Sequence, residues 1–302
     1  MGLVEKIFKN GDVIIKEGDI GKSFFLLTEG KAGVYANYGK NEPFRIAMLE
    51  PGEYFGEMAI LEEYPRSATV VAAGNAHAIE IPADEMSTFF QEHPEQVLEL
   101  MKHLSTRVAA MTADYNESQA LLKDVRSKET DKKNESFFSK IKKHIDVYQN
   151  NKTKLSEPDE EKLRKAFEAI PSGLGGTTES LKQDTILFQE GQIDNCMYIL
   201  TKGNLSTYTD LDEDAEQKVA DYVPYALLGE LDMINGDPRS ESCVAETDDT
   251  CVEIFNENDI TSMVTTCPAK IDWMLRYLSY RVRRLTIDFL AACKEITESY
   301  NS

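Results

Sequence analysis

The chain has 302 residues, which suggests about two domains, and 41% of them are hydrophobic, enough for packed cores. The 53 acidic residues outnumber the 33 basic ones, and the formal net charge of -20 argues against binding to a nucleic acid duplex. No run approaches the ~18 apolar residues of a membrane span, and the histidines lack metal-ligand spacing. The five cysteines show no disulfide framework, and the start MGLVEKIFKN lacks a signal-peptide core, so we expect a cytoplasmic protein.

The first part of the chain predicts short strands separated by glycine-containing turns. Strands at regular spacing with glycine turns are typical of a β-sandwich or barrel. The predicted strand segments are 12–19, 23–30, 31–38, 44–52, 67–73 and 76–81.

A long amphipathic helix is predicted next, starting near Pro94. Its apolar positions are spaced alternately four and three residues apart, which is a heptad seam interrupted by Ser118. The seam consists of Val97, Met101, Leu104, Val108, Met111, Tyr115, Ser118, Leu122 and Val125.

The segment after this helix is polar and predicts a partly helical linker. Phe138, Ile141, Ile145 and Tyr148 form an apolar stripe beside three lysines. Such a helix either lies on a membrane surface or packs on its own domain, and packing is the commoner case. Further on, Pro158 and the acidic run DEE predict a short helix that ends near Pro171.

The second part of the chain repeats the first at an offset of 173 residues. Gly191 follows Gly18, and Arg239 follows Arg66, at this spacing, and EGDIGKSFFLLTEG aligns with EGQIDNCMYILTKG without a gap. A period of this length indicates one duplicated domain. A second helical seam closes the chain at Ile271, Leu275, Leu278, Val282, Leu285, Phe289, Ala292 and Ile296.

These patterns predict a mixed α and β fold. Each domain is a small β-barrel of the jelly-roll (double-stranded β-helix) kind, followed by a long amphipathic helix. The predicted boundaries are 1–126 for the first domain, 127–156 for the linker and 157–302 for the second domain.

Both copies also share one polar motif. Residues 55–69 read FGEMAILEEYPRSAT and residues 228–242 read LGELDMINGDPRSES, so each has Gly-Glu with Pro-Arg-Ser starting eight residues after the Glu. The first stretch resembles the phosphate-binding cassette of cyclic nucleotide-binding domains. That family includes the catabolite activator protein (Crp/Fnr type) and the regulatory subunits of cyclic-AMP-dependent kinase, and the likeness spans roughly residues 8–125 and 180–300.

The resemblance implies a ligand site whose chemistry fits these residue types. Arginine offers a planar donor fork to a phosphate, so Arg66 is expected to bind the phosphate and Glu57 to accept from the ribose 2′-hydroxyl. Glycine allows a close backbone approach, and a helix N-terminus favours an anion. The residues expected at the ligand besides Glu57 and Arg66 are Gly56, Met58, Ala59, Ser67 and Ala68. The alternative is that Glu57 and Arg66 pair with each other in an empty, structural domain.

The second cassette departs from the pattern. Gly229, Glu230, Arg239 and Ser240 keep it, but Asp232 and Glu241 replace two alanines. Like charges in a poorly solvated pocket oppose a bound anion. We therefore expect this second site to be empty or altered.

The base of the ligand is less well specified. By resemblance, Tyr115 and Asn116 lie where the helix after the barrel caps the base, although Tyr115 also fits the seam. Cyclic-GMP kinases usually place Thr after the arginine, whereas Ser67 is found here. The ligand is thus cyclic AMP or cyclic GMP, and Ser67 favours cyclic AMP.

The resemblance leaves several functions open. The favoured one is a stand-alone sensor that signals to an unknown protein partner. A ligand-free scaffold is the alternative, and a Crp/Fnr-type regulator is disfavoured because a second barrel stands where a helix-turn-helix would follow. A kinase regulatory subunit would carry an inhibitor segment before the first domain, and no catalytic set suggests an enzyme, metal or cofactor. The two long helices are expected to pair, either within a monomer as an internal pseudo-dimer or across a homodimer.

Overall fold

The computed structural model describes residues 4–40, 43–127, 135–150, 155–171, 173, 175–211 and 216–301. The chain divides into two compact units, each made of several segments. The first unit comprises Met1–Met86, Arg107–Pro158 and Ser279–Ser302, and the second comprises Ser87–Thr106 and Asp159–Leu278. The domain boundaries predicted from the sequence repeat divide the chain by position along the sequence, and they stay a prediction.

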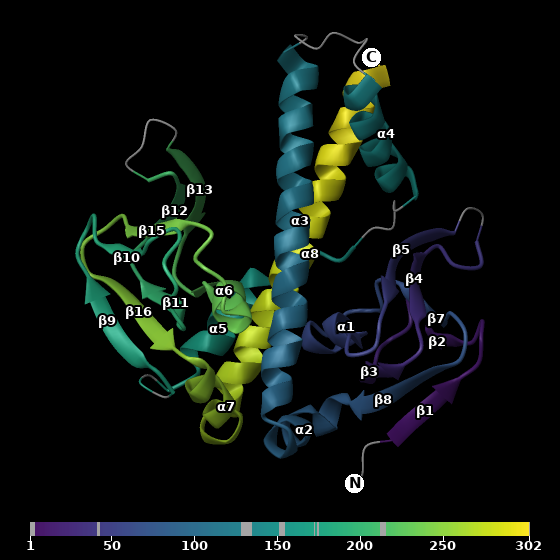
Figure 1. Cartoon of the computed structure of the whole chain (residues 1–302), viewed down its shortest axis with the longest axis horizontal. Coiled ribbons are helices and arrows are strands. Elements are labelled where there is room, and N and C mark those ends of the chain that lie inside the picture. Colours follow the sequence, from purple (N-terminus) through teal and green to yellow (C-terminus); the bar gives the residue numbers. More distant parts are fainter. Residues whose placement is uncertain are drawn as a thin grey trace. The chain divides into compact units, whose positions relative to one another are not determined.

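The first unit contains a sandwich of two four-stranded antiparallel sheets, in the orders β1-β8-β3-β6 and β2-β7-β4-β5 (Figure 1). In β3, Phe25 and Leu27 alternate toward the core between the sheets, as a period of two requires. The predicted strands are confirmed, and β1 and β6 are additional. The strands are β1 (Val4–Phe8), β2 (Val13–Ile15), β3 (Ser23–Glu29), β4 (Ala32–Ala36), β5 (Phe44–Leu49), β6 (Tyr54–Phe55), β7 (Thr69–Ala72) and β8 (Ala76–Pro82).

The second unit contains a sandwich with the same topology. Its sheets have the orders β9-β16-β11-β14 and β10-β15-β12-β13, in which every strand number is eight higher than its counterpart in the first sandwich. The duplication predicted from the sequence is therefore confirmed by the strand order. The strands are β9 (Thr177–Leu181), β10 (Ile186–Phe188), β11 (Met197–Lys202), β12 (Leu205–Thr209), β13 (Gln217–Tyr222), β14 (Ala226–Leu228), β15 (Ser242–Ala245) and β16 (Thr250–Phe255).

The helices follow the duplication as well. One short helix lies within each cassette and one long helix follows each sandwich, as predicted. The short ones are α1 (Glu57–Leu61) and α6 (Glu230–Asn235), and the long ones are α3 (Glu95–Ser127) and α8 (Pro268–Asn301). The others are α2 (Met86–Glu92), after a 3₁₀ turn at Ala83–Glu85, α4 (Glu135–Asn150), α5 (Glu160–Glu168) and α7 (Glu257–Thr266).

Within the first unit, the later parts of α3 and α8 pack against each other. Val108 on α3 and Val282 on α8 share a buried cluster with Met58 of α1. The seam contact that the sequence predicts is therefore present. Further along, a second cluster joins Leu122 of α3 and Ile296 of α8.

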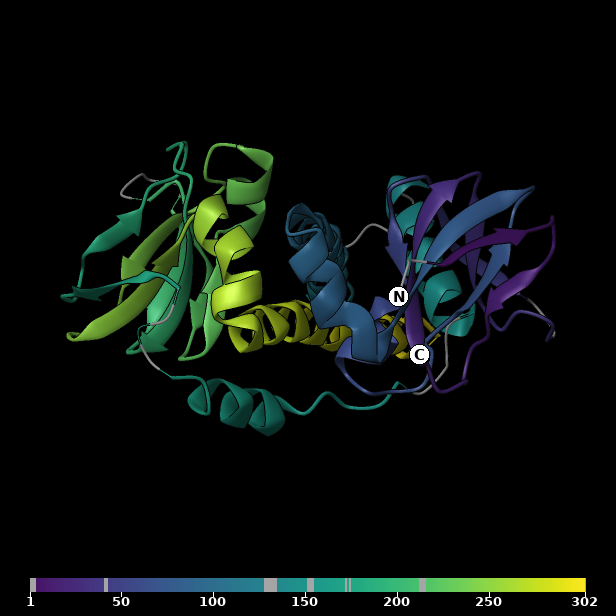
Figure 2. The same cartoon turned by 90° about the horizontal axis from the view of Figure 1, so that it is seen from below.

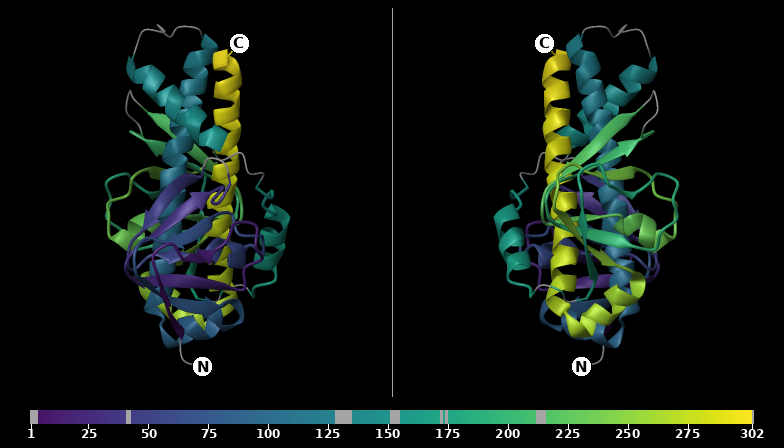
Figure 3. Two further views of the ribbon diagram at one scale, coloured as in Figure 1. Left: turned by 90° about the vertical axis from the view of Figure 1, so that its right-hand side faces the viewer. Right: turned by 90° about the vertical axis from the view of Figure 1, so that its left-hand side faces the viewer.

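Helix α4 belongs to the first unit and covers this helix pair (Figure 3). Ile141 is 1% exposed and lies in the cluster with Leu122 and Ile296, and Ile145 packs at its edge. The ring of His144 meets Phe289 edge-on at 5.6 Å. The apolar stripe of this helix thus packs on its own chain, which was the commoner of the two readings.

The second unit is completed by α5, α7 and the first part of α8 (Figure 2). Helix α5 starts where the sequence predicts, since Asp159 caps it by accepting from the Lys162 amide at 3.0 Å. Phe167 of α5 packs edge-on against Trp273 at 4.7 Å, and the Trp273 indole N–H donates to the Leu163 carbonyl at 3.1 Å. Helix α5 is therefore anchored to α8 within the second unit.

Candidate functional site

Both cassettes begin with a glycine that no other residue can replace without strain. Gly56 has φ 80, directly before α1, and Gly229 has φ 71, directly before α6. A β-carbon at Gly56 would lie 2.7 Å from Arg66 Nη1, and one at Gly229 would lie 2.4 Å from Arg239 Nη1. Glycine is needed because the arginine reaches the cassette backbone at this point.

The backbone of Arg66 is fixed by the loop between β2 and β3. Its amide donates to the Asp19 carbonyl at 2.8 Å, and its carbonyl accepts from the Gly18 amide at 2.9 Å. Pro65 forms an isolated bridge with Ile20 in the same loop. The turn that aims Arg66 is thus held by main-chain hydrogen bonds from 47 and 48 positions earlier in the chain.

The side chain of Arg66 points under the cassette. The residue is 8% exposed, Nη1 donates to the Gly56 carbonyl, and Nη2 donates to the Ser23 carbonyl. In the part of the chain that the structure describes, Arg66 forms no ion pair with a carboxylate. Burial lowers the pKa of this guanidinium, although the carboxylate of Glu57 counteracts the effect. A buried arginine with only carbonyl acceptors is suited to an anionic ligand.

Glu57 is also buried, at 2% exposure. Its Oε1 accepts from Nη1 of Arg107, on α3, at 2.7 Å. The described hydrogen bond of the Glu57 carboxylate thus comes from α3, although the same carboxylate also acts on the pKa of Arg66. The sequence analysis did not single out Arg107, and its position beside the seam residue Val108 is the signal that would have found it.

The other expected ligand residues lie around these two side chains. Met58 and Ala59 are buried in α1, Ser67 is exposed and Ala68 is half-buried after the arginine. Tyr115 is half-buried and Asn116 is exposed on α3, about two helical turns after Val108. Their assignment to the base remains a prediction.

The opposite end of α1 is held by α8. Oε2 of Glu62 accepts from Nε of Arg283 at 2.5 Å, and its Oε1 accepts from the Ser279 hydroxyl at 2.6 Å. The ring of Tyr64 lies 4.6 Å from the Arg283 guanidinium. The first cassette is thus bound at Glu57 to α3 and at Glu62 to α8, all within the first unit.

The second cassette keeps the backbone arrangement of the first. The Arg239 amide donates to the Gln192 carbonyl at 2.8 Å, and its carbonyl accepts from the Gly191 amide at 2.9 Å. Glu230 is 5% exposed and accepts from the Ser105 hydroxyl at 3.4 Å. Ser240 is exposed, as Ser67 is. The four motif residues therefore have the same positions in both copies.

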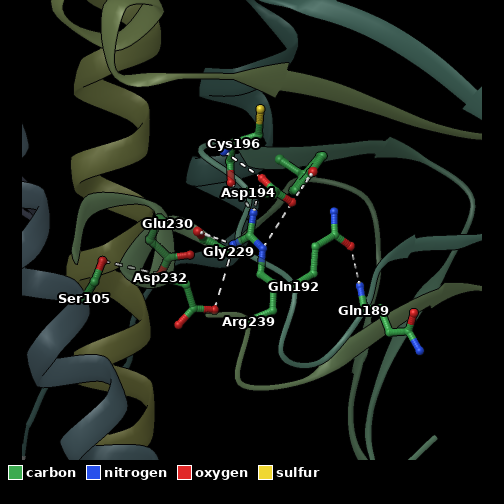
Figure 4. A network of polar contacts seen from close by, with 10 residues as sticks. Ser105, Gln189, Gln192, Asp194, Cys196, Gly229, Glu230, Asp232 and Arg239 are labelled. Carbon is green, nitrogen blue, oxygen red and sulfur yellow. Dashed lines mark hydrogen bonds and ion pairs between the residues drawn. The ribbon is translucent and has the colours of Figure 1, made fainter. Parts of the chain in front are cut away.

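The arginine of the second cassette has a different environment. Its side chain is fully buried and makes an ion pair with Asp194 at 2.8 Å, a residue that the sequence analysis did not single out (Figure 4). Asp232, which it did single out, lies farther away, 3.8 Å from Arg239 Nη1. Burial raises the pKa of Asp232, and Arg239 acts to lower it. Glu241 is half-buried.

Tyr225 stands where the first copy has Gly52 and adopts a φ of 74. Its hydroxyl donates to Glu168 at 3.2 Å, and its ring meets Phe167 at 5.2 Å. This tyrosine thus joins the second sandwich to α5, which accounts for a side chain at a position with positive φ.

No described helix is long and apolar enough to cross a membrane. Within the described ranges, no group of three His, Cys, Asp or Glu side chains is arranged to hold a metal ion.

Comparison with known proteins gives similarities at three levels. The family profile described as "Cyclic nucleotide-binding domain" matches residues 5–93 and 178–265, together more than half of the chain. A segment of 65 residues, 22% of this chain, is 49% identical to a cGMP-dependent protein kinase of Plasmodium berghei (strain Anka) and spans 7% of that kinase.

Solved structures are similar at lower identity. The structure of cAMP-bound PfPKA-R is 17% identical, with a TM-score of 0.37, and the match covers 89% of this chain and 74% of that one. The catabolite activator protein of Thermus thermophilus is 25% identical, with a TM-score of 0.33, over 41% of this chain and 63% of that one. The two segments matched by the profile contain both cassettes and nearly all of both sandwiches. The chain therefore belongs to the family of cyclic nucleotide-binding domain proteins and carries two copies of that domain.

Proposed function

We propose that this chain is a sensor that binds one cyclic mononucleotide through its first cassette and signals to a separate protein. The observation that supports this proposal most is the burial and hydrogen bonding of Arg66. This guanidinium is buried beside Gly56, and its described hydrogen bonds go to two carbonyl groups. A phosphodiester supplies the charge that those carbonyls lack, through a charge-assisted pair.

The proposed ligand is cyclic AMP, and cyclic GMP is the competing ligand. Ser67, rather than threonine, follows the arginine, which by resemblance favours cyclic AMP. The similar Plasmodium kinase is named for cyclic GMP, which makes the guanine ligand the natural comparison. Calorimetry with cyclic AMP, cyclic GMP and linear AMP tests the proposal. We expect cyclic AMP to bind most tightly, and no binding of either cyclic nucleotide would refute the proposed function.

The route by which binding is read out starts at Glu57. A ribose hydroxyl donating to Glu57 competes with Arg107, which now occupies that carboxylate at 2.7 Å. Because Arg107 is on α3 and α1 also contacts α8 through Glu62, a change at this carboxylate alters how α1 is held between the two helices. We propose that a protein partner detects the resulting rearrangement of the helix pair.

The helix pair itself gives a separate prediction. Val108 and Val282 are 4% and 2% exposed and share one cluster, so cysteines at both positions should form a cross-link within one chain. Mild oxidation followed by electrophoresis and peptide mass spectrometry detects this bond. The pair Val108→Cys and Arg284→Cys is the matched control, since Arg284 is exposed.

The cross-link, together with the mass of the reduced protein in solution, distinguishes a monomer from a homodimer. Light scattering of the reduced protein should give the mass of one chain, 34.0 kDa. A stable species of twice that mass, in which the cross-link joins two chains, would instead support a homodimer that pairs its long helices across a two-fold axis.

A further inference from the structure

The second cassette carries an acid at a position where the first has glycine. Asp194 corresponds to Gly21 at the offset of 173 residues. Both lie in the loop that fixes the backbone of the cassette arginine through the same two main-chain hydrogen bonds. A β-carbon added at Gly21 would lie 2.6 Å from Cζ of Arg66. A side chain at this position therefore meets the guanidinium directly.

Asp194 binds Arg239 through both of its oxygens (Figure 4). Nη2 of Arg239 donates to Oδ1 at 2.8 Å, and Nε donates to Oδ2 at 3.3 Å. This is the forked geometry in which a guanidinium binds a carboxylate or a phosphate most strongly. Two more donors of Arg239 are used, since Nη1 donates to the Gly229 carbonyl at 2.8 Å and Nη2 to the Cys196 carbonyl.

The carboxylate of Asp194 is in turn held in place. The Cys196 amide donates to Oδ1 at 2.8 Å, and the Tyr198 hydroxyl donates to Oδ2 at 3.0 Å. With the two donors of Arg239, the group accepts four hydrogen bonds, and its side chain is 13% exposed. These bonds fix the orientation of the carboxylate toward Arg239.

Aromatic rings complete the enclosure of Arg239. Its Cζ lies 4.6 Å from the ring centre of Phe188 and 5.6 Å from that of Tyr198. The guanidinium therefore contacts aromatic rings in addition to its hydrogen-bond acceptors. Its side chain has no exposed surface. In the first cassette, by contrast, the described hydrogen bonds of Arg66 go to carbonyl groups alone.

We propose that Asp194 is a built-in substitute for the ligand phosphate. Its carboxylate occupies Arg239 and thereby prevents the second cassette from binding anionic cyclic nucleotides. A phosphodiester that entered this site would have to displace Asp194 from the fork and leave its carboxylate buried without the arginine. Asp232, 3.8 Å from the same guanidinium, adds a second negative charge. Removing the partner of a buried charge is strongly unfavourable, so the exchange is opposed.

The test uses the full chain with the first site weakened by Arg66→Ala, and a change at Arg239 assigns the remaining binding to the second cassette. In an Arg66→Ala background, Asp194→Gly should raise the affinity for cyclic AMP roughly 10- to 150-fold, the value of one charge-assisted contact regained. Calorimetry should find close to one equivalent. A further Arg239→Ala change should abolish the gain, which assigns it to the second cassette.

Two other variants at this cassette keep the test decisive. Asp194→Asn keeps the size and removes the charge, so it should give a smaller gain even if Asp194→Gly folds poorly. Asp232→Ala is the control for general negative charge, and its more exposed position limits its effect to roughly fivefold. The proposal is overturned if neither Asp194 variant gains binding, or if Arg66→Ala alone already binds one equivalent through Arg239.

The reciprocal change is made in the first cassette of the otherwise unmodified chain. Gly21→Asp should place a carboxylate on Arg66 and abolish cyclic nucleotide binding. Gly21→Ala adds only the β-carbon, which would lie 2.6 Å from Arg66 Cζ, so it measures the steric part of the loss. This arm depends on the proposed function, whereas the Asp194 variants in the Arg66→Ala background do not. Failure of wild-type binding would refute the proposed function, and failure of the Asp194 variants would refute this inference. Wild-type affinity of Gly21→Asp would also count against a carboxylate at this position displacing the ligand phosphate.

Discussion

Replacing Arg66 by alanine is expected to weaken cyclic nucleotide binding about 10- to 150-fold, as measured by calorimetry. The guanidinium is buried beside Gly56, and its described hydrogen bonds go to two carbonyl groups. Its removal takes away about 1.5–3 kcal/mol, the value of a hydrogen bond to a charged group. Arg66→Lys should also bind weakly, because an ammonium keeps the charge but loses the planar fork.

Two comparisons separate a lost contact from a damaged domain. Arg45 is exposed on β5 of the same sandwich, so Arg45→Ala removes the same charge from the surface and should leave affinity within about twofold at moderate salt. Thermal unfolding of Arg66→Ala in the absence of ligand reports on the two carbonyl groups that lose their donor. Equal affinity of the wild type, Arg66→Ala and Arg45→Ala would exclude Arg66 as the phosphate-binding residue.

The fold was predictable from the sequence to an unusual extent because the chain repeats itself. The constant offset of 173 residues aligned the two copies, so weak strand signals in one were supported by the other, and the strand orders of the two sandwiches agree. The strands that the sequence analysis did not predict, β1 and β6 among them, are the ones with little pattern. β1 is mostly exposed and β6 has only two residues, so neither shows the alternation that marks a half-buried strand.

The division of the long helices was not predictable in the same way. A heptad seam indicates that a helix face is buried but does not name the partner. The seam on α3 belongs to the second unit up to Thr106 and to the first unit from Arg107 onward. Which unit each part of α3 packs in depends on tertiary packing, and a repeated apolar pattern does not specify that packing.

The site was predictable where it depends on adjacent residues and not where it depends on distant ones. Glu57 and Arg239 each lie in one copy of the motif, whereas their observed partners come from other segments. Glu57 pairs with Arg107 on α3, and Arg239 pairs with Asp194 in the loop before β11. Asp232 and Glu241 were expected to spoil the second site because they lie within the motif. Asp194 lies 45 positions before Arg239, and as a polar residue in a glycine-containing loop it resembles an ordinary turn residue.

The contact between the first cassette and α8 fixes where these elements pack more than it stabilises the fold. Arg283 and Glu62 have side chains that are 3% and 7% exposed. Burial raises the pKa of the Glu62 carboxyl above its ordinary 4.5, even though Arg283 and Ser279 act to lower it. Desolvation therefore exceeds the attraction within the pair, as is common for buried ion pairs. The pair fixes the position of α8 at the end of α1, and its loss is costly because one charge remains buried.

We therefore expect Arg283→Ala to lower the free energy of unfolding by about 3–5 kcal/mol, because it leaves Glu62 buried without its counter-ion. The neighbouring Arg284 is 52% exposed and pairs only with Asp288 and Glu157 among the described residues, so Arg284→Ala should cost at most about 1 kcal/mol. Urea denaturation of both variants measures the difference.

The double variant Glu62→Ala with Arg283→Ala completes a thermodynamic cycle, and it should cost less than the sum of its single changes, since no unpaired charge is left behind. Strict additivity, or equal losses at Arg283 and Arg284, would mean that the ion pair does not link the first cassette to α8. A positive coupling energy that shrinks when cyclic nucleotide is added would show that ligand at Glu57 is felt at the other end of α1.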